Sequence, residues 1–313
     1  MIRHVKKDHI HTASVYAFAI LFAVGLSFFA KNPSDKDRGI ITRQNDKIIN
    51  KEEPEALYLF KNKPFENLNI AAEAYVVYDV VGKRIIASRN ENTKLPLASL
   101  TKIMTGITAL SMYEKDKNVI IKGQNLDGGY DLGLTANQSW KLDELLKYTL
   151  VFSSNDGAQA IADGLGGKDV FITNMNKVSM ELNLNMSFTN AAGLDIDGKT
   201  GGIGSALDVA KMMAIAQKLM PQILDSTTHT RAAVVSSSGV LTGIPNTNQM
   251  VDKFSGLEAS KTGFTDMAGG NLALIIDVTL GRPVVIVILG STKNERFTDA
   301  YKLYKALKES VTE

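Results

Sequence analysis

The stretch PLASLTKIMT at residues 96–105 places Ser99 three positions before Lys102, where a helix is expected to begin. Leu100 and Ile103 recur at helical spacing and would face the core, which leaves the serine and the lysine together on one face. A lysine in that position can act as general base for the serine hydroxyl, and the N–H groups of a helix start can stabilise an oxyanion. Because Ser-x-x-Lys occurs by chance about once in a chain of this length, the pair needs support from other motifs.

The composition removes most other kinds of covalent catalysis. The 313 residues include no cysteine, so a thiol nucleophile, a disulfide framework, an iron–sulfur site and a cysteine-ligated zinc are excluded. His229 is the one histidine beyond the N-terminus, and a lone histidine is more often structural than part of a Ser-His-Asp triad. The net charge of +2, from 35 cations and 33 anions, gives no basis for a nucleic-acid partner. We therefore expect a serine–lysine mechanism with no metal and no cofactor.

A second polar motif, SSN at residues 153–155, lies between two expected helices, 142–151 and 156–164. A loop at this point can aim the hydroxyl of Ser153 and the amide of Asn155 into a cleft. The alternative is a simple helix cap, because serine and asparagine favour that position.

A third motif, KTG at residues 261–263, ends an expected strand. Lys261 would supply a fixed positive charge, Thr262 has a hydroxyl that can bind a carboxylate, and Gly263 lets another segment approach the backbone closely. A Lys-Thr-Gly triplet is expected by chance in about one of ten chains of this length. The three motifs in this order, each on the expected element, are far more specific than any one of them.

The periodicity of apolar residues predicts strands toward both ends of the chain and helices in the middle. The expected strands are 74–79, 84–88, 231–235, 257–262, 270–278 and 284–290, and the expected helices are 100–110, 142–151, 156–164, 170–182, 206–219 and 295–307. We predict an α+β fold in which the two outer strand blocks form one antiparallel sheet flanked by helices. A helical lobe at about 100–229 is inserted between the blocks, and the cleft between sheet and lobe is the expected site.

The N-terminal residues are predicted to lie outside this domain. Residues 12–30 carry no charge and would span about 28 Å as a helix, close to the hydrocarbon thickness of a bilayer. Cations before them predict that residues 1–11 stay in the cytoplasm, so that 12–30 is a transmembrane anchor in the cell membrane and the domain 70–313 is extracytoplasmic. A cleaved signal peptide is the alternative interpretation. Residues 31–69 are polar and are predicted to form a linker.

The three motifs and their surroundings resemble the low-molecular-mass penicillin-binding proteins, the D-alanyl-D-alanine carboxypeptidases. The matching segments are PLASLTKIMT at 96–105, SSNDGA at 153–158 and KTGFTDMAGGNL at 261–272. The similarity runs from about residue 74 to the C-terminus. The resemblance implies a β-lactamase/transpeptidase-like fold. It also implies removal of the terminal D-alanine from peptidoglycan stem peptides through an acyl-enzyme, with β-lactam antibiotics trapping the same serine.

The resemblance assigns a role to each residue of the first two motifs. Ser99 is the acylated nucleophile and Lys102 is its general base, while Ser153 and Asn155 relay protons and hold the substrate amide. Lys102 must then be partly neutral, and both burial and a second cation nearby, Lys261, favour a neutral amine.

At the third motif the resemblance implies contacts with the substrate. Lys261 tunes the local field, and Thr262 contacts the terminal carboxylate. Gly263 follows them, and the backbone N–H of Phe264 forms the oxyanion hole together with that of Ser99.

Three alternatives remain open. A D-Ala-D-Ala endopeptidase of the same family would cut peptidoglycan cross-links, and the chain ends after the helix 295–307 without the extra C-terminal β domain that the family's carboxypeptidases often carry. The stretch ELNLN at 181–185 fits the Glu-x-x-Leu-Asn pattern of class A β-lactamases, although a solvated helix residue is the simpler interpretation of Glu181. A non-catalytic penicillin sensor would need a cytoplasmic signalling part, for which residues 1–11 are too short.

Overall fold

The computed structural model describes residues 60–126 and 134–311. The predicted anchor at 12–30, the predicted tip at 1–11 and the first part of the predicted linker lie outside the described residues. Within the described part of the chain, no helix is long and apolar enough to cross a membrane.

Residues 60–69, at the end of the predicted linker, pack onto the C-terminal helix. Phe65 is buried at the end of the 3-10 helix η1 (Lys63–Phe65), which lies against α8 (Glu295–Ser310). Phe60 pairs with Val311 in an isolated β-bridge. The folded domain therefore begins about ten residues before the boundary that polarity alone indicates.

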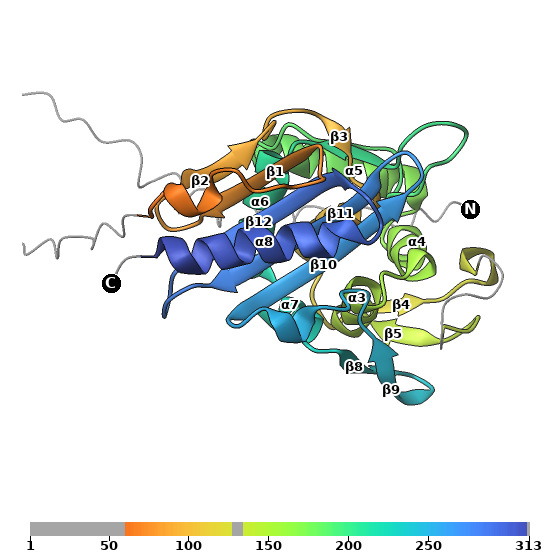
Figure 1. Ribbon diagram of the computed structural model, residues 1–313. Helices are drawn as coiled ribbons and strands as arrows, with labels where there is room; N and C mark the ends of the chain where they lie inside the picture. The colour runs from red at the N-terminus through yellow and green to blue at the C-terminus, as the bar shows by residue number, and fades with distance from the viewer. Residues whose placement is uncertain (1–59, 127–133, 312–313) are drawn as a thin grey trace, which may run out of the picture. The chain divides into compact units, whose positions relative to one another are not determined.

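One antiparallel sheet forms the centre of the domain and joins strands from both ends of the chain (Figure 1). Its order is β10-β11-β12-β1-β2, so the last strand of the sequence lies beside the first. The strands are β1 (Ala74–Asp79), β2 (Arg84–Arg89), β10 (Leu257–Thr265), β11 (Gly269–Asp277) and β12 (Pro283–Ser291). This topology confirms the predicted union of the two outer strand blocks.

Both faces of the central sheet are buried, because its strands alternate apolar side chains between two clusters. On β12, Val285 and Val287 face the helical lobe, whereas Val284 and Ile286 face α8. Figure 1 shows α8 in front of β10, β11 and β12, with α6 (Ala206–Leu219) on the other face. The nearly continuous apolar runs of β11 and β12 follow from burial on both sides.

The lobe is built mainly from helices that follow the nucleophile motif in the sequence. The helices predicted at 142–151 and 206–219 are confirmed at both ends, and the other predicted helices begin and end within three residues of the expected positions. The lobe helices are α2 (Thr101–Met112), α3 (Leu142–Val151), α4 (Asn155–Gly164), α5 (Lys168–Glu181), α6 (Ala206–Leu219) and α7 (Pro221–Asp225).

The strand predicted at 231–235 exists but belongs to a different sheet, so its assignment to the central sheet is wrong. It is β8 (Arg231–Ser236), which pairs with β9 (Gly239–Pro245) and with β5 (Ser139–Lys141) in a sheet of order β4-β5-β8-β9, where β4 is Asn118–Ile120. The periodicity does not predict β9, because glycines and a terminal proline interrupt its apolar alternation. The lobe consequently continues past residue 229.

Candidate active site

The three motifs, far apart in the sequence, meet where the central sheet contacts the lobe. Ser99 lies in the 3-10 helix η2 (Ala98–Leu100), which continues directly into α2. The SSN loop at 153–155 leads into α4, and the KTG motif at 261–263 lies on β10, an edge strand of the central sheet. Contacts of β10 with η2 and of α2 with α4 bring the three motifs together.

Lys102 is fully buried and lies at the centre of the polar contacts. Its Nζ is 2.8 Å from Ser99 Oγ, 2.8 Å from Asn155 Oδ1 and 2.7 Å from the carbonyl oxygen of Ala192. The two carbonyl-type oxygens can only accept, so the amine must donate to both. A neutral amine has two N–H groups for these acceptors and a lone pair left for the hydroxyl proton of Ser99. The geometry therefore suits a general base at Lys102 Nζ.

The SSN loop divides two tasks between neighbouring serines. Ser154 is the N-cap of α4, and its hydroxyl accepts a hydrogen bond from the N–H of Gly157 at 2.7 Å. Ser153 has a left-handed backbone with a φ of 63°, and its hydroxyl accepts a hydrogen bond from Lys261 Nζ at 2.8 Å. Backbone strain of this kind is typical of functional sites. The helix cap falls on Ser154, which leaves Ser153 and Asn155 for the polar contacts of the site.

Lys261 is a second buried lysine beside the first. Its Nζ donates to Ser153 Oγ and to the carbonyl oxygen of Thr262, both at 2.8 Å. Burial lowers the pKa of Lys261 well below its usual range, and the positive charges of Lys102 and Arg296 lower it further. A positive charge on one lysine thus disfavours a positive charge on the other. A lysine that acts as a base requires such an environment, because it must give up its proton.

Gly263 is needed because β10 passes very close to the nucleophile helix. A Cβ at this position would lie 2.9 Å from the carbonyl oxygen of Leu97 and 3.2 Å from the backbone nitrogen of Ser99. Phe264 is the next residue along β10, and its N–H is expected to stabilise an oxyanion together with that of Ser99. The Phe264 side chain is 40% exposed, and Lys293 Nζ lies 5.3 Å from its ring.

The motifs do not predict Arg296, which the structure adds to this group. Its side chain comes from α8, is largely buried and donates from Nη1 to the carbonyl oxygen of Gly263 at 2.5 Å. Burial lowers the pKa of Arg296 to about 10. A signal for it does exist in the sequence, because Arg296 falls at helical spacing from Ala300 and Leu303, on the buried face of the helix expected at 295–307.

The carbonyl group of Ala192 is held for the lysine by a tight turn. Asn190 Oδ1 accepts hydrogen bonds from the N–H groups of Ala192, Gly193 and Leu194 at 3.2, 2.7 and 3.0 Å. Gly193 has a φ of 80°, and a Cβ there would lie 1.9 Å from the carbonyl oxygen of Ala98. Glycine is therefore the residue that fits this turn.

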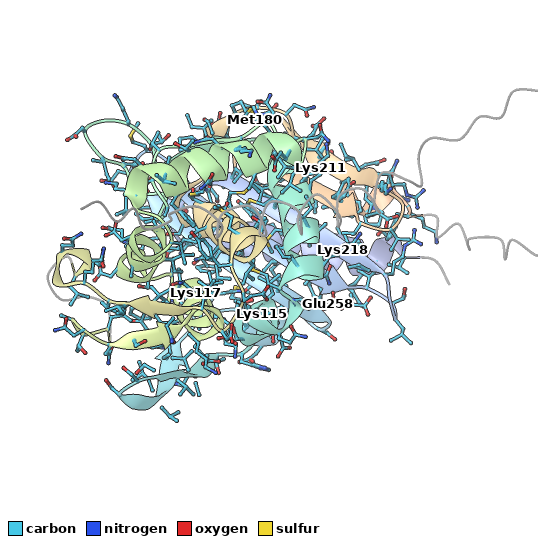
Figure 2. All side chains as sticks on the ribbon, turned by 180° about the vertical axis from the view of Figure 1, so that it is seen from behind. Lys115, Lys117, Met180, Lys211, Lys218 and Glu258 are labelled. Atoms are coloured by element: carbon cyan, nitrogen blue, oxygen red, sulfur yellow. The ribbon has the colours of Figure 1, made fainter. Side chains whose placement is uncertain are left out.

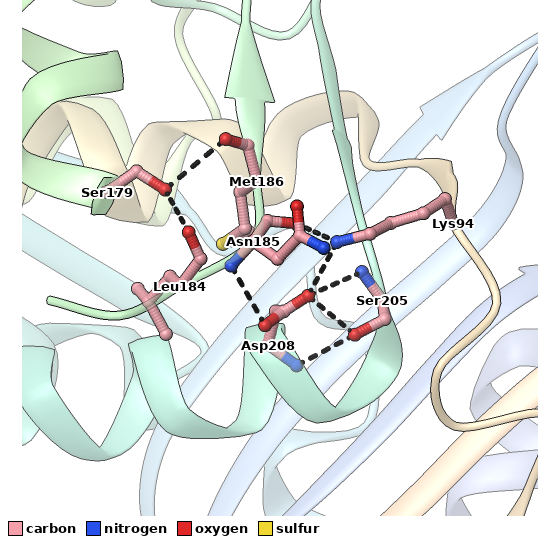
Figure 3. Close-up of polar contacts among 7 residues, drawn as sticks. All are labelled: Lys94, Ser179, Leu184, Asn185, Met186, Ser205 and Asp208. Atoms are coloured by element: carbon pink, nitrogen blue, oxygen red, sulfur yellow. Dashed lines mark hydrogen bonds and ion pairs between the residues drawn. The ribbon is translucent and has the colours of Figure 1, made fainter.

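A second polar cluster fixes the segment that leads into the nucleophile (Figure 3). Asp208, in the first turn of α6, accepts hydrogen bonds from Lys94 Nζ at 2.9 Å, Ser205 Oγ at 2.7 Å and the N–H of Asn185 at 3.2 Å. Burial alone would raise the pKa of Asp208, but these hydrogen bonds and the charge of Lys94 outweigh it, and the pKa is lowered. Lys94 directly precedes β3 (Leu95–Pro96), so this cluster ties the strand before the nucleophile to α6.

Glu181 and His229, which other mechanisms would use, both face solvent. Glu181 ends α5, and its carboxylate lies 3.7 Å from Lys177 Nζ one turn earlier. Figure 2 views the domain from behind and shows the neighbouring Met180 at the outer surface of the lobe. The interpretation of Glu181 as a solvated helix residue is confirmed.

The His229 side chain is 65% exposed and lies 4.0 Å from Asp225. Among the described residues, no group of three His, Cys, Asp or Glu side chains could hold a metal ion.

A buried lysine bonded to a serine at a helix start, with a second lysine and a polar loop beside it, is an arrangement that suits a serine nucleophile activated by a lysine. The comparison with protein families agrees. Residues 61–293 match the model of the D-alanyl-D-alanine carboxypeptidase family, peptidase family S11. The chain belongs to this family of serine peptidases.

The related proteins carry two names within this family. The chain is 27% identical to D-alanyl-D-alanine carboxypeptidase DacF of Bacillus subtilis over 260 residues, which are 80% of this chain and 65% of that protein. It is 28% identical to a D-alanyl-D-alanine endopeptidase of Escherichia coli over 243 residues, 75% of this chain and 76% of that protein.

Solved structures establish the fold. Penicillin-binding protein D2 of Listeria monocytogenes, in its ampicillin-bound form, superimposes with a TM-score of 0.68 at 26% identity and covers 77% of this chain and 99% of its own. The DD-transpeptidase of Streptomyces K15 does so with a TM-score of 0.67 at 24% identity and covers 76% of this chain and 97% of its own. The predicted transpeptidase-like fold, an antiparallel sheet with a helical lobe, is confirmed.

Proposed function

We propose that this protein is a serine-type D-alanyl-D-alanine carboxypeptidase that removes the terminal D-alanine from peptidoglycan stem peptides. The observation that carries the proposal is the 2.8 Å contact of Lys102 Nζ with Ser99 Oγ, where two other oxygens occupy the N–H groups of a neutral amine. Membership of the carboxypeptidase family supports the substrate class.

Acylation starts when Ser99 Oγ attacks the carbonyl carbon of the penultimate D-alanine and its proton moves to Lys102 Nζ. The charge that develops on the carbonyl oxygen is stabilised by the N–H groups of Ser99 and Phe264 and by the positive end of α2. The proton then passes to the nitrogen of the departing D-alanine, and the Ser153 hydroxyl provides the relay. Water attacks the acyl-enzyme in the second half of the reaction, with Lys102 again as the base.

The terminal carboxylate of the substrate distinguishes it from an internal peptide segment. Thr262 offers a buried hydroxyl whose Oγ1 lies 2.7 Å from Thr247 Oγ1. Lys261 and Arg296 supply positive charge beside it, and both lie close to the KTG backbone. A carboxylate placed here gains charge-assisted hydrogen bonds, which are stronger than bonds between neutral groups.

The experiment uses a pentapeptide that ends in D-Ala-D-Ala and, separately, a cross-linked muropeptide, with mass spectrometry of both products. Loss of one alanine from the pentapeptide, abolished by Ser99→Ala, is the expected result. Cleavage of the muropeptide alone would instead assign the endopeptidase activity. That alternative has direct support, because relatives named endopeptidase match at 27% to 29% identity, as closely as the carboxypeptidases do.

We infer that β-lactam antibiotics acylate Ser99 by the same steps, since their strained amide presents a carbonyl group and a carboxylate in a similar arrangement. The ampicillin-bound relative supports this inference. A stable adduct on the peptide that contains Ser99, seen by mass spectrometry after incubation with penicillin, is the expected result; an unmodified peptide would contradict it.

We also propose that residues 12–30 anchor the protein in the cell membrane, with the catalytic domain outside the cytoplasm. The uncharged stretch and the cations before it support the proposal. Retention of the full-length chain in membranes after carbonate extraction is the expected result. Release of a shortened chain would support the cleaved signal peptide instead.

A further inference from the structure

One end of the central sheet carries exposed apolar side chains on two neighbouring turns. Leu280, in the turn between β11 and β12, is fully exposed, and Val81, in the turn between β1 and β2, is 43% exposed. The N–H of Val80 donates to the carbonyl oxygen of Pro283 at 3.1 Å, so the two turns lie side by side. Exposed apolar side chains are stabilised when they leave water. We call Val81 and Leu280 together the apolar tip.

Exposed lysines surround the apolar tip. Lys308, on the last turn of α8, donates from Nζ to the carbonyl oxygen of Val278 at 3.2 Å, shortly before the turn that carries Leu280. The backbone N–H of Lys61 donates to the carbonyl oxygen of Ser310 at 3.0 Å, at the end of the same helix. We call the exposed lysines of this end the basic rim; they are Lys61, Lys83, Lys305 and Lys308.

Two carboxylates at this end are bonded within the protein. Asp79 is fully buried and forms ion pairs with Arg84 at 3.2 Å and with Arg282 at 2.8 Å. Asp277 Oδ1 accepts a hydrogen bond from the backbone N–H of Arg282 at 2.7 Å. Glu309 is an exposed anion beside the basic rim, and the lysines of the rim outnumber it. The surface around the apolar tip therefore favours an anionic partner.

The chain that precedes the described domain enters at the same end. Phe60 pairs with Val311 just beyond α8, and its ring centroid lies 5.5 Å from the guanidinium carbon of Arg84. In Figure 1 this end lies at the left, where η1 meets the C-terminal end of α8. The proposed anchor ends at residue 30, and a coil of the length of residues 31–59 spans about 30 Å. A domain with such a tether has this end within reach of the membrane surface.

The reaction centre lies toward the opposite end of the sheet. Gly263 of the KTG motif pairs with Asn271, and β11 continues from there to Asp277 over about 20 Å. Helix α8 runs between the same two ends, because Arg296 contacts Gly263 and Lys308 lies about 18 Å farther along the helix axis. A surface that contacts the basic rim is therefore about 20 Å from the KTG motif.

We propose that the apolar tip and the basic rim bind the anionic phospholipid surface of the membrane that carries the anchor. Val81 and Leu280 enter the interface between headgroups and acyl chains, and the lysines lie among the phosphate groups. So small a surface binds a free protein weakly, but a tether makes the contact intramolecular. The reaction centre then faces away from the membrane. The inference goes beyond the proposed function and depends on the proposed anchor only for the tether.

The test uses an environment-sensitive fluorophore on a single introduced cysteine, since the chain has none of its own. Full-length protein with Leu280→Cys, labelled with nitrobenzoxadiazole, is reconstituted in vesicles of phosphatidylcholine with or without phosphatidylglycerol. With phosphatidylglycerol, the emission should shift to shorter wavelength and be quenched by lipids that carry a nitroxide high on the acyl chain. Val240→Cys, at a 66% exposed position on β9 in the lobe, is the matched control and should emit as in water.

Reversing two charges assigns the contact to the basic rim. Lys83→Glu combined with Lys305→Glu should abolish the emission shift of the label at position 280. The same change at Lys122 and Lys177, two exposed positions in the lobe, should keep it. Salt at about 1 M, where the Debye length is about 3 Å, should reduce the shift in the protein without charge changes. Unchanged acylation by fluorescent penicillin shows that the variants fold.

The proposal is overturned by an emission from position 280 that is the same with and without phosphatidylglycerol, or by a shift that survives the reversal of both lysines. A shift of equal size with inorganic polyphosphate in place of anionic lipid would also overturn it. Carbonate extraction of the same vesicles tests the anchor separately. If the protein is released, the anchor proposal fails, and the labelled protein is added to vesicles from outside. A shift that requires phosphatidylglycerol then still supports the lipid contact, and no shift overturns it.

Discussion

Replacing Lys261 by methionine tests whether this buried amine makes the unfolding free energy depend on pH and whether its charge speeds acylation. The change keeps the length of the side chain and removes the buried amine with its hydrogen bonds to Ser153 and to the Thr262 carbonyl oxygen. In the folded protein, burial and then the charges of Lys102 and Arg296 lower the pKa of Lys261. In the unfolded chain a lysine has a pKa of about 10.4.

Between these two pKa values the unfolded chain binds one proton more than the folded protein. The contribution of Lys261 therefore makes the free energy of unfolding rise with pH in that window, by up to about 1.4 kcal/mol per pH unit. Below the folded pKa both states hold the proton, and the contribution no longer changes with pH. Lys261→Met abolishes this dependence, so just below the unfolded pKa of about 10.4 the variant's unfolding free energy should rise less steeply with pH than that of the wild type.

Urea titrations at several pH values, followed by the fluorescence of the single, buried Trp140, measure both slopes. Lys177→Met is the control, because that side chain is 67% exposed and its loss should leave the slope unchanged. The rate of acylation by fluorescent penicillin should fall about 100-fold in Lys261→Met, since a cation near the developing charge is lost. Equal pH slopes for Lys261→Met and the wild type would refute the electrostatic reasoning.

Three further substitutions test separate parts of the structure. Ser154→Ala removes the N-cap of α4 and should lower the free energy of unfolding in urea by about 1 kcal/mol; an unchanged value would contradict the cap. The stability that Asp208 contributes is present above the unfolded pKa of about 3.9 and is lost as pH falls through its lowered folded pKa, so Asp208→Asn should show a weaker pH dependence in acid unfolding followed by circular dichroism. An acid profile identical to that of the wild type would count against this ion pair with Lys94. Gly193→Ala puts a Cβ 1.9 Å from the carbonyl oxygen of Ala98, so penicillin acylation should fall about 100-fold, and a wild-type rate would show that the turn does not matter.

Elements with strong local signals were predictable from the sequence, and those that depend on distant contacts were not. Helices α3 and α6 have apolar residues at regular helical spacing, and β11 and β12 are long apolar runs bounded by turns, so tertiary contacts agree with local preference. Strands β4 and β5 have three residues each, too few for any period to show. Their position depends on pairing with β8 and on packing around the buried Trp140.

The residues of the candidate site also differ in whether the sequence alone could predict them. Ser99, Lys102 and the KTG motif could be found because side-chain chemistry at fixed short spacing is visible in one sequence. The carbonyl group of Ala192 carries no such signature, because every residue has one, and only the fold places it 2.7 Å from Lys102 Nζ. Arg296 follows Gly263 by 33 positions, and the contact between them arises from the packing of α8 on the sheet.

The most direct test of proton transfer from Ser99 to Lys102 is the rate of acylation by fluorescent penicillin, with the adduct located by peptide mass mapping. We expect the label on Ser99, no label in Ser99→Ala, and a rate at least about 100-fold lower in Lys102→Met, the range expected for loss of a general base. Undiminished labelling of either variant would contradict a serine nucleophile activated by this lysine.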